Sequence, residues 1–388
     1  MTDFLPFAQP SIGDEEIADV VDCLKNGWLT TGKRAARFEA DFADFLGVDH
    51  ALAVNSATAG LHLALEAIGV GRGDKVLTSV NTFTATTEVI RYLGADPVLV
   101  DIDPDTLNLS VDGIRSCLEK TENCKAIIPV HFAGQLCEMN EILDMAKRHD
   151  VRVIEDAAHA IPASYKGQMV GTMSDLSVFS FYATKPIATG EGGMVVTNNP
   201  AYAQRIKTMR LHGINRDVFD RYTSSKPAWH YDVVAPGYKY NLSDIAAAMG
   251  IHQLAKAHIF HEKRQAIAEK YNEAFADLPV ILPRVKRPLD IHSWHLYVIQ
   301  LELERLGINR DVFIEQMARE GVGTSVHFIP IHLHSYWRER YGYRPDDFPN
   351  AHAVYQRCVS LPIYPKMTND DVSRVIGAVE SILKANLR

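Results

Sequence analysis

Short apolar segments alternate with amphipathic ones over the first half of the chain. Seven of the apolar segments are rich in β-branched residues and nearly continuous in hydrophobicity, which is typical of strands covered on both faces of a sheet. They span residues 51–54, 75–79, 97–101, 125–130, 151–155, 176–181 and 193–197. Between them lie stretches with helical spacing, at residues 59–68, 84–93, 111–120 and 138–148. This alternation predicts an α/β domain with a mostly parallel seven-stranded sheet and helices on both faces.

The second half of the chain predicts a smaller α/β domain. A polar, irregular stretch at 216–240 is expected to be a long loop, and long loops in compact proteins are often functional. The pattern after it predicts a long helix at 243–278, strands at 294–301 and 322–328, and helices at 310–319 and 370–383. We therefore predict a large domain at residues 1–250 and a small C-terminal domain at residues 251–388.

Composition and charge narrow the class of protein. The chain has 388 residues, 47% hydrophobic and 23% charged, which is ordinary globular composition. The net charge is −8 and long Lys/Arg runs are absent, so we expect no nucleic-acid partner. Five cysteines without CxxC spacing indicate a reduced, cytoplasmic protein. The first residues lack a signal-peptide pattern and no run approaches about 18 apolar residues, so we expect no membrane span.

A lysine after one apolar strand and an aspartate at the end of another carry the chemical prediction. Lys185 follows the strand at 176–181 and precedes a Gly/Thr-rich turn, and Asp156 lies 29 residues earlier. Alone, the lysine would be interpreted as a solvated surface residue and the aspartate as a helix cap. Together they match the needs of pyridoxal 5′-phosphate (PLP), since the lysine can form the Schiff base and the aspartate can keep the pyridine nitrogen protonated. Ligands bind beyond the carboxyl ends of parallel strands, where both residues are expected.

Two further segments are candidates for the phosphate of this cofactor. Ser180 lies five residues before the lysine and offers a hydroxyl. Ala57 and Thr58 follow the first strand and open a helix, where free backbone N–H groups suit a phosphate. Taken alone, that turn could equally be an ordinary Ser/Thr helix cap. The lysine nearby in the predicted fold favours phosphate binding.

Aromatic residues and histidines complete the candidate set. Phe83 ends the second strand and is placed to stack on the pyridine ring, with a core position as the alternative. His159 is placed to touch the ring or its O3′ side, with a structural histidine as the alternative. The cluster of His327, His332 and His334 suggests a metal site as an alternative, but no carboxylate or cysteine completes a ligand set nearby. We therefore expect no metal and interpret the cluster as part of a substrate-lining loop.

Together these residues resemble the sugar aminotransferases of the DegT/DnrJ/EryC1/StrS family over essentially the whole chain. The motifs that carry the resemblance lie at residues 27–32, 56–62, 128–134, 155–160, 180–193 and 237–244. Within the family, the resemblance is closest to the aminotransferases that make UDP-4-amino-4-deoxy-L-arabinose. In their reaction the amino donor L-glutamate becomes 2-oxoglutarate. The resemblance implies a fold-type-I PLP enzyme that works as a homodimer with shared active sites.

The resemblance also assigns roles by motif position. Lys185 corresponds to the Schiff-base lysine and Asp156 to the partner of the pyridine nitrogen, while Phe83 and His159 flank the ring. The implied phosphate contacts are Ala57, Thr58 and Ser180, with Lys239 or Asn241 reaching the phosphate or nucleotide of the neighbouring subunit. The implied substrate contacts are Thr31, Tyr182, His327 and Phe328.

The expected reaction is transamination of a nucleotide-linked 4-keto sugar with L-glutamate as amino donor. Phe83 replaces a tryptophan of the arabinose enzymes, and residues 329–331 replace their Arg-Ala-Ala. A 4-keto-6-deoxy-N-acetylhexosamine or a 3-keto sugar therefore stays open as the substrate, and the nucleotide stays open too. Related 3-dehydratases carry histidine at the position of Lys185, which argues against them. A PLP-bound regulator would need a DNA-binding or membrane segment, and neither is visible.

Overall fold

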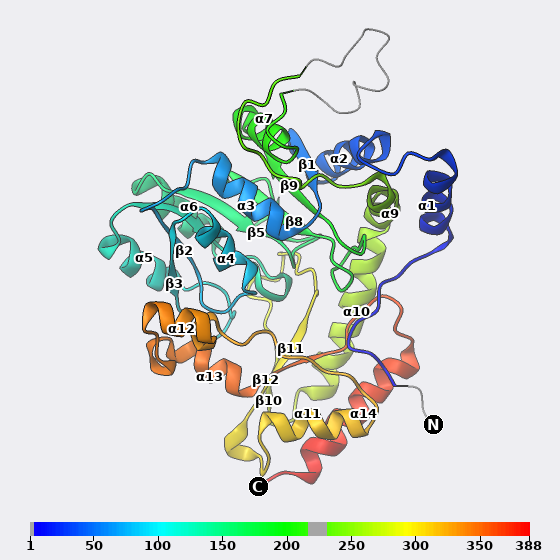
Figure 1. Ribbon diagram of the computed structural model, residues 1–388. Helices are drawn as coiled ribbons and strands as arrows, with labels where there is room; N and C mark the ends of the chain where they lie inside the picture. Colours follow the sequence, from blue (N-terminus) through cyan, green and yellow to red (C-terminus); the bar gives the residue numbers. More distant parts are fainter. Residues whose placement is uncertain (1–3, 216–230) are drawn as a thin grey trace.

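A seven-stranded sheet organises the larger part of the molecule (Figure 1). The computed structural model describes residues 4–215 and 231–388. In sheet order the strands are β1 (His50–Val54), β9 (Gly193–Thr197), β8 (Leu176–Ser180), β5 (Arg152–Asp156), β4 (Cys124–Ile128), β2 (Lys75–Ser79) and β3 (Asp96–Val100). Pairing from β3 to β8 is parallel, and β9 runs antiparallel to both of its neighbours. The predicted fold class, a mostly parallel α/β sheet, is confirmed.

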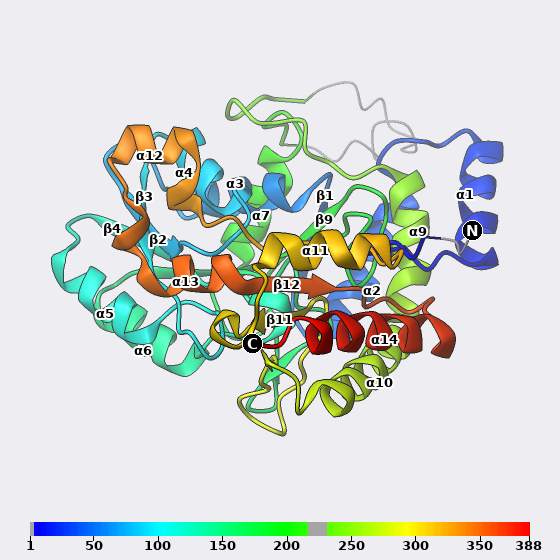
Figure 2. The same ribbon diagram turned by 90° about the horizontal axis from the view of Figure 1, so that it is seen from below.

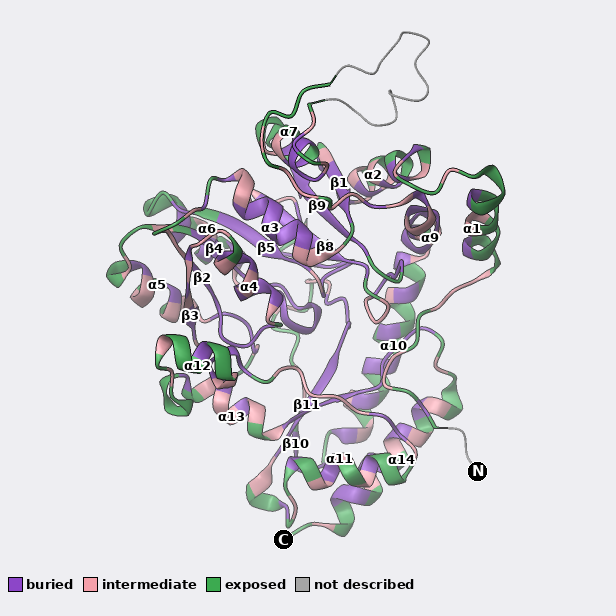
Figure 3. Cartoon of the chain, in the orientation of Figure 1, coloured by how far each residue is buried: buried purple, intermediate pink, exposed green. Residues whose placement is uncertain are grey.

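Helices cover both faces of this sheet, which explains the nearly continuous apolar strands. One face carries α2 (Lys33–Leu46), α5 (Val111–Lys120) and α6 (Met139–Arg148), and the other carries α3 (Ala57–Ala67), α4 (Ala85–Tyr92) and α7 (Pro200–Met209). Side chains alternate between the two cores along each strand, so that Val178 packs on one face and Phe179 on the other. Figure 3 shows the sheet largely buried, and its exposed residues lie near strand starts, at Lys125 and Arg152.

The C-terminal part is built around a three-stranded antiparallel sheet of β10 (Val280–Ile281), β11 (Tyr297–Leu301) and β12 (Cys358–Leu361). Its helices are α10 (Ala257–Phe275), α11 (Arg310–Arg319), α12 (Ser335–Tyr341), α13 (Pro349–Arg357) and α14 (Asn369–Ala385). Figure 2 shows α10, α11 and α14 beside this sheet. Leu5 joins the same hydrophobic core through a bridge to Val322, so the start of the chain packs here. A short hairpin pairs β6 (Ser164–Tyr165) with β7 (Gln168–Met169).

Several expected elements differ from the structure. The predicted strand at 322–328 makes only isolated bridges, at Val322 and Ser325, because none of the described strands pairs with it continuously. The long helix predicted at 243–278 is divided at Lys256 into α9 (Asp244–Ala255) and α10. Most of the loop predicted at 216–240 lies outside the described residues. The domain boundary at residue 250 stays a prediction.

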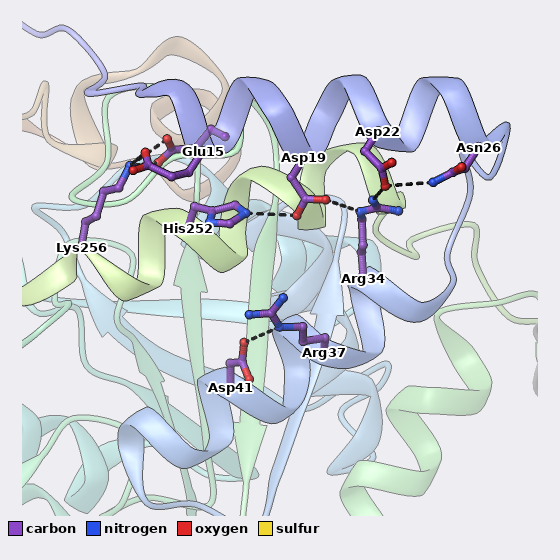
Figure 4. A network of polar contacts seen from close by, with 10 residues as sticks. Glu15, Asp19, Asp22, Asn26, Arg34, Arg37, Asp41, His252 and Lys256 are labelled. Atoms are coloured by element: carbon purple, nitrogen blue, oxygen red, sulfur yellow. Dashed lines mark hydrogen bonds and ion pairs between the residues drawn. The ribbon is translucent and has the colours of Figure 1, made fainter.

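A polar network holds the N-terminal helix α1 (Asp14–Asn26) against α2 and α9 (Figure 4). Asp19 accepts a hydrogen bond from Arg34 Nε at 2.7 Å, and its other oxygen lies 3.1 Å from His252 Nε2. Lys256 Nζ lies 2.9 Å from a carboxylate oxygen of Glu15. Such partly exposed pairs contribute about 1 kcal/mol or less each. Their effect is to orient α1 relative to α2, which the loop at residues 27–32 joins to it.

Phe42 tests the core that anchors this arrangement. Its ring is fully buried and lies 5.1 Å from the ring of Phe179 and 5.7 Å from that of Phe181. Phe42→Ala is expected to lower the free energy of unfolding by about 3–5 kcal/mol, since it leaves a cavity under the sheet. Leu289→Ala is the control, because Leu289 is 90% exposed and should change stability by about 0.5 kcal/mol or less. Denaturant titrations of both variants measure the difference, and equal midpoints would contradict the assignment.

Candidate active site

The carboxyl ends of β5 and β8 meet at one edge of the sheet and open into a cavity of about 470 Å³. Asp156 ends β5, Ser180 ends β8, and a tight turn that closes with the Lys185 N–H donating to the Tyr182 carbonyl brings Lys185 to the same place. The structure thus gathers ten of the predicted site residues in one cavity wall: Ala57, Thr58, Phe83, Asp156, His159, Ser180, Tyr182, Lys185, His327 and Phe328.

Asp156 and Lys185 have perturbed acidities for a shared reason. Burial raises the pKa of Asp156, although Thr86 Oγ1 donates to it at 2.8 Å and the Ala158 N–H donates at 3.2 Å. Burial also lowers the pKa of Lys185 to about 8, and the nearby charge of Asp156 opposes the shift only in part. A lysine of this kind is a usable nucleophile and base near neutral pH. Among the described residues Asp156 has no ion-pair partner, which suits a protonated pyridine nitrogen.

The start of α3 faces the same cavity and fits a phosphate. Ser56 caps the helix by accepting the Ala59 N–H at 3.1 Å, and this leaves the first backbone N–H groups of the helix directed at the cavity. Ser180 adds a buried hydroxyl from the end of β8. Gly193 on β9 passes so close that a Cβ there would lie 2.8 Å from the Ala57 nitrogen. The sequence explains this approach, because only glycine leaves room for it.

Histidine and phenylalanine rings form the walls on either side. His159 is buried, and its Nδ1 accepts the Ala133 N–H at 3.3 Å, so the ring proton sits on Nε2. Burial and the charge of Lys185 hold the His159 pKa well below its usual value, which keeps the ring neutral. Phe328 stacks on His159 with centroids 5.9 Å apart. Phe83 is 60% exposed at the cavity mouth, so the alternative that it is a core residue is wrong.

Thr31, Lys239 and Asn241 lie outside the cavity of their own chain. Asn241 Nδ2 donates to Thr31 Oγ1 at 2.6 Å, and Lys239 Nζ donates to Asn241 Oδ1 at 2.5 Å. Thr31 in turn donates to the Leu242 carbonyl at 2.5 Å. The three side chains therefore form one surface cluster, and the prediction that they reach a neighbouring subunit stays a prediction.

Sequence reasoning missed several residues that line the cavity, among them Thr86, Glu191 and His295. Thr86 supplies a hydroxyl to Asp156 from 70 residues away, and Glu191 lies on the turn after Lys185. His295 comes from the C-terminal part and packs its ring 4.4 Å from that of His159. Two features of the sequence could have pointed to Thr86 and His295. Thr86 lies close to Phe83 in the sequence, and a short run of polar residues precedes His295, but neither feature is specific to a cofactor site.

The remaining histidines of the predicted cluster do not line the catalytic cavity. His332 is fully buried against Phe348, and its Nε2 lies 3.3 Å from the Pro345 carbonyl. His334 contacts the Ile329 carbonyl and lines a neighbouring cavity. Within residues 4–215 and 231–388, no group of three or more His, Cys, Asp or Glu side chains is arranged to hold a metal ion. None of the helices in these ranges is long and apolar enough to cross a membrane.

Comparison with known proteins agrees with this geometry. The profile of the DegT/DnrJ/EryC1/StrS aminotransferase family matches residues 10–380. The chain belongs to this family. An uncharacterized protein of Methanocaldococcus jannaschii, MJ1066, is 51% identical over 99% of this chain and 98% of its own length. The spore coat polysaccharide biosynthesis protein SpsC of Bacillus subtilis is 46% identical over 98% of this chain and 97% of its own length.

Solved structures extend the comparison to the cofactor. The putative sugar aminotransferase Spr1654 of Streptococcus pneumoniae, in its PMP form, superposes with a TM-score of 0.91 at 31% identity over 98% of this chain and 99% of its own. Its PLP form matches equally well, with a TM-score of 0.91. Helicobacter pylori PseC, an aminotransferase of pseudaminic acid biosynthesis, gives 0.91 at 29% identity over 99% of this chain and 100% of its own. The protein is a PLP-dependent sugar aminotransferase, and the cofactor prediction is confirmed.

The lowered pKa of Lys185 predicts a specific dependence of stability on pH. Between pH 8 and about 10.5 the unfolded chain keeps the proton on this lysine and the folded chain does not. The free energy of unfolding of the cofactor-free enzyme should therefore rise with pH in that window, by at most ~3 kcal/mol from this group. Lys185→Met removes the group, so its stability curve should lack this rise, and the wild type should gain stability relative to the variant as the pH increases. Parallel curves would contradict the prediction.

A substitution at Gly193 tests whether the start of α3 binds the cofactor phosphate. Gly193→Ala places a Cβ against the backbone of residues 56 and 57 and should push the start of α3 away from the cavity. We expect the dissociation constant of PLP to rise at least about tenfold, because the helix terminus supplies the anion-binding N–H groups. Gly71→Ala is the matched control, since a Cβ there meets nothing within 4 Å. Fluorescence titration of the cofactor-free proteins measures both, and equal affinities would contradict the role of this helix terminus.

Proposed function

We propose that the enzyme transfers an amino group from L-glutamate to the 4-keto carbon of a nucleotide-linked sugar. The observation that carries this proposal is a second cavity, of about 770 Å³, which shares Thr82, Phe83 and Phe328 with the catalytic cavity. An amino acid needs little space, whereas a sugar joined to a nucleotide needs both cavities. The roles of SpsC in spore coat polysaccharide synthesis and of PseC in pseudaminic acid synthesis support a sugar substrate.

The roles proposed for the chain's own residues follow from the cavity. When bound, PLP supplies an electron sink for the carbanion that transamination requires. The carboxylate of Asp156 holds the proton on the pyridine nitrogen, and the neutral ring of His159 supports one face of the cofactor. The start of α3 and the Ser180 hydroxyl hold the phosphate. Phe83 and Phe328 exclude water from the reacting atoms.

Lys185 is proposed to attach the cofactor and to move the proton during each half of the reaction. Its amine takes a proton from Cα of the amino donor and delivers a proton to C4 of the sugar in the second half. A pKa of about 8 suits both tasks, because the group can be charged or neutral near physiological pH. Turnover is therefore expected to follow ping-pong kinetics.

A homodimer is proposed as the working form. The cluster of Thr31, Lys239 and Asn241 lies outside the cavity of its own chain, where it would contact an anionic group held by a second copy. Lys239 carries the positive charge and Asn241 the amide, and the two side chains are already joined by a hydrogen bond. Separate variants of Lys239 and Asn241 would decide which of the two side chains contacts the phosphate.

The proposal is tested by following the visible absorbance of the PLP-loaded enzyme. L-Glutamate should bleach the band of the lysine-linked cofactor, and a UDP-linked 4-keto pentose should restore it. Return of the band only with a 4-keto-6-deoxy-N-acetylhexosamine or a 3-keto sugar would keep the reaction and change the substrate. No return with any keto sugar nucleotide would overturn the sugar assignment.

Lys185→Ala is expected to reduce turnover by at least roughly 10³-fold while leaving the protein folded, since it removes both the attachment point and the base. Lys125→Ala is the matched control, because Lys125 is exposed at the start of β4, away from the cavity. Steady-state assays with circular dichroism as the folding check measure the effect. Sustained ping-pong turnover in Lys185→Ala would refute the role of this lysine.

A further inference from the structure

His295 lines the catalytic cavity, and its ring makes no hydrogen bond to the part of the chain that the structure describes. The residue is 6% exposed and lines the cavity beside His159. Its Nδ1 is buried and has no partner. Its Nε2 keeps access to the cavity and also has no hydrogen-bond partner among the described residues. The cost of a buried polar group without a partner, about 1–3 kcal/mol, falls on Nδ1, while Nε2 stays free to bond to a ligand atom.

The residues on either side of His295, in contrast, are held by hydrogen bonds. The Ser293 N–H donates to the Gly134 carbonyl at 3.1 Å, and the Ser293 hydroxyl donates to the His159 carbonyl at 2.5 Å. The Leu296 N–H donates to the Ala133 carbonyl at 3.3 Å. These bonds fix the segment from the C-terminal part onto the loops after β4 and β5.

Trp294, directly before His295, has a φ of +50°, which costs a non-glycine residue of order 1–3 kcal/mol. Its N–H donates to His292 Nδ1 at 2.9 Å, and its carbonyl accepts from the guanidinium of Arg264 at 3.4 Å. The fold thus tolerates strain in order to present the next side chain. A strained backbone that is anchored on both sides of an imidazole without a hydrogen bond points to a functional role for that ring.

Burial keeps the His295 ring neutral. It is the largest cause that lowers the pKa of His295, and the positive charges of Lys185 and Arg264 act in the same direction. A neutral imidazole has one N–H to donate. Because Nε2 is the nitrogen with access to the cavity, it is the nitrogen that can meet a ligand.

The chemistry of the cavity decides which ligand group this is. Among the described residues that line it, Lys185 is the cationic one, and it is the reacting amine. His159 Nδ1 and His327 Nδ1 are occupied, by the Ala133 N–H and by Ser360 Oγ respectively. The α-carboxylate of an amino acid lies two bonds from the nitrogen that reacts. It must therefore lie inside the catalytic cavity, close to Lys185.

We propose that His295 recognises the amino donor, by donating a hydrogen bond from Nε2 to the α-carboxylate of that amino acid. The inference rests on the proposed function only in taking L-glutamate as the donor, since every α-amino acid carries this carboxylate. The keto sugar, which has no carboxylate at the reacting carbon, does not use the bond. His295 therefore acts in the half-reaction with the amino acid and not in the half-reaction with the keto sugar.

The test is a single-turnover comparison of PLP-loaded wild type, His295→Asn and His295→Gln. L-Glutamate bleaching gives the rate constant of the first half-reaction, and return with the keto sugar gives that of the second. We expect His295→Asn to slow the first about 10–100-fold at low glutamate and to leave the second within about twofold. His295→Gln should recover part of the loss, because its amide nitrogen reaches the position of Nε2. Binding of 2-methyl-L-glutamate, which has no Cα hydrogen to lose, should weaken in parallel.

Two controls make the result specific. 4-Aminobutyrate lacks the α-carboxylate, so wild type and His295→Asn should react with it at equal rates. His332→Asn removes another buried histidine with an unpartnered Nδ1, and His332 lies outside the catalytic cavity. This variant should keep the wild-type rate with L-glutamate even where it unfolds at lower denaturant.

Three outcomes overturn the proposal: an unchanged rate in His295→Asn, an equal loss in both half-reactions, or an equal loss with 4-aminobutyrate. Failure of the wild type to react with L-glutamate would instead refute the donor given under the proposed function. The comparison would then be made with L-aspartate, L-glutamine or L-alanine, which carry the same α-carboxylate and test His295 alone.

Discussion

The parallel pairing of β5 with β8 is the constraint on which the site depends. It sets Asp156 opposite Val178, so a carboxylate at the end of one strand faces the turn that carries Lys185. Both groups are then buried in one cavity, and burial shifts both pKa values so that the neutral forms are favoured. No loop needs to close to bring the acid and the base together, because backbone hydrogen bonds inside the sheet already do so.

Alternation along β5 separates two carboxylates that are adjacent in the chain. Glu155 points to the other face of the sheet, where His131 Nε2 lies at 2.7 Å and the hydroxyls of Ser174 and Ser177 donate at 2.7 and 2.8 Å. Burial alone would raise its pKa, but these partners outweigh burial and hold the pKa below its usual value. Asp156 has fewer donors, so its pKa moves upward. The same strand thus holds one carboxylate for structure and leaves the next for chemistry.

Much of this arrangement was predictable from the sequence, because it depends on local patterns. Continuous apolar runs indicated strands buried on both faces, and a lysine and an aspartate at strand ends indicated the cofactor. Positions that depend on long-range packing were not predictable. Thr86 reaches Asp156 across 70 residues, and Ser293 reaches His159 across 134. The region at 322–328 has the composition of a strand, but pairing requires a partner that the fold does not place beside it.

The origin of each wall of the cavity separates cofactor binding from substrate recognition. Residues expected to hold PLP come from the ends of the large sheet and the start of α3, which backbone hydrogen bonds make rigid. Phe328, His327 and His295 come from segments of the C-terminal part that cross onto the sheet edge. Changes in those segments can reshape the space offered to a sugar or an amino acid without moving Asp156 or Lys185. This division gives a physical reason why one cofactor site can serve a family of enzymes that act on different sugars.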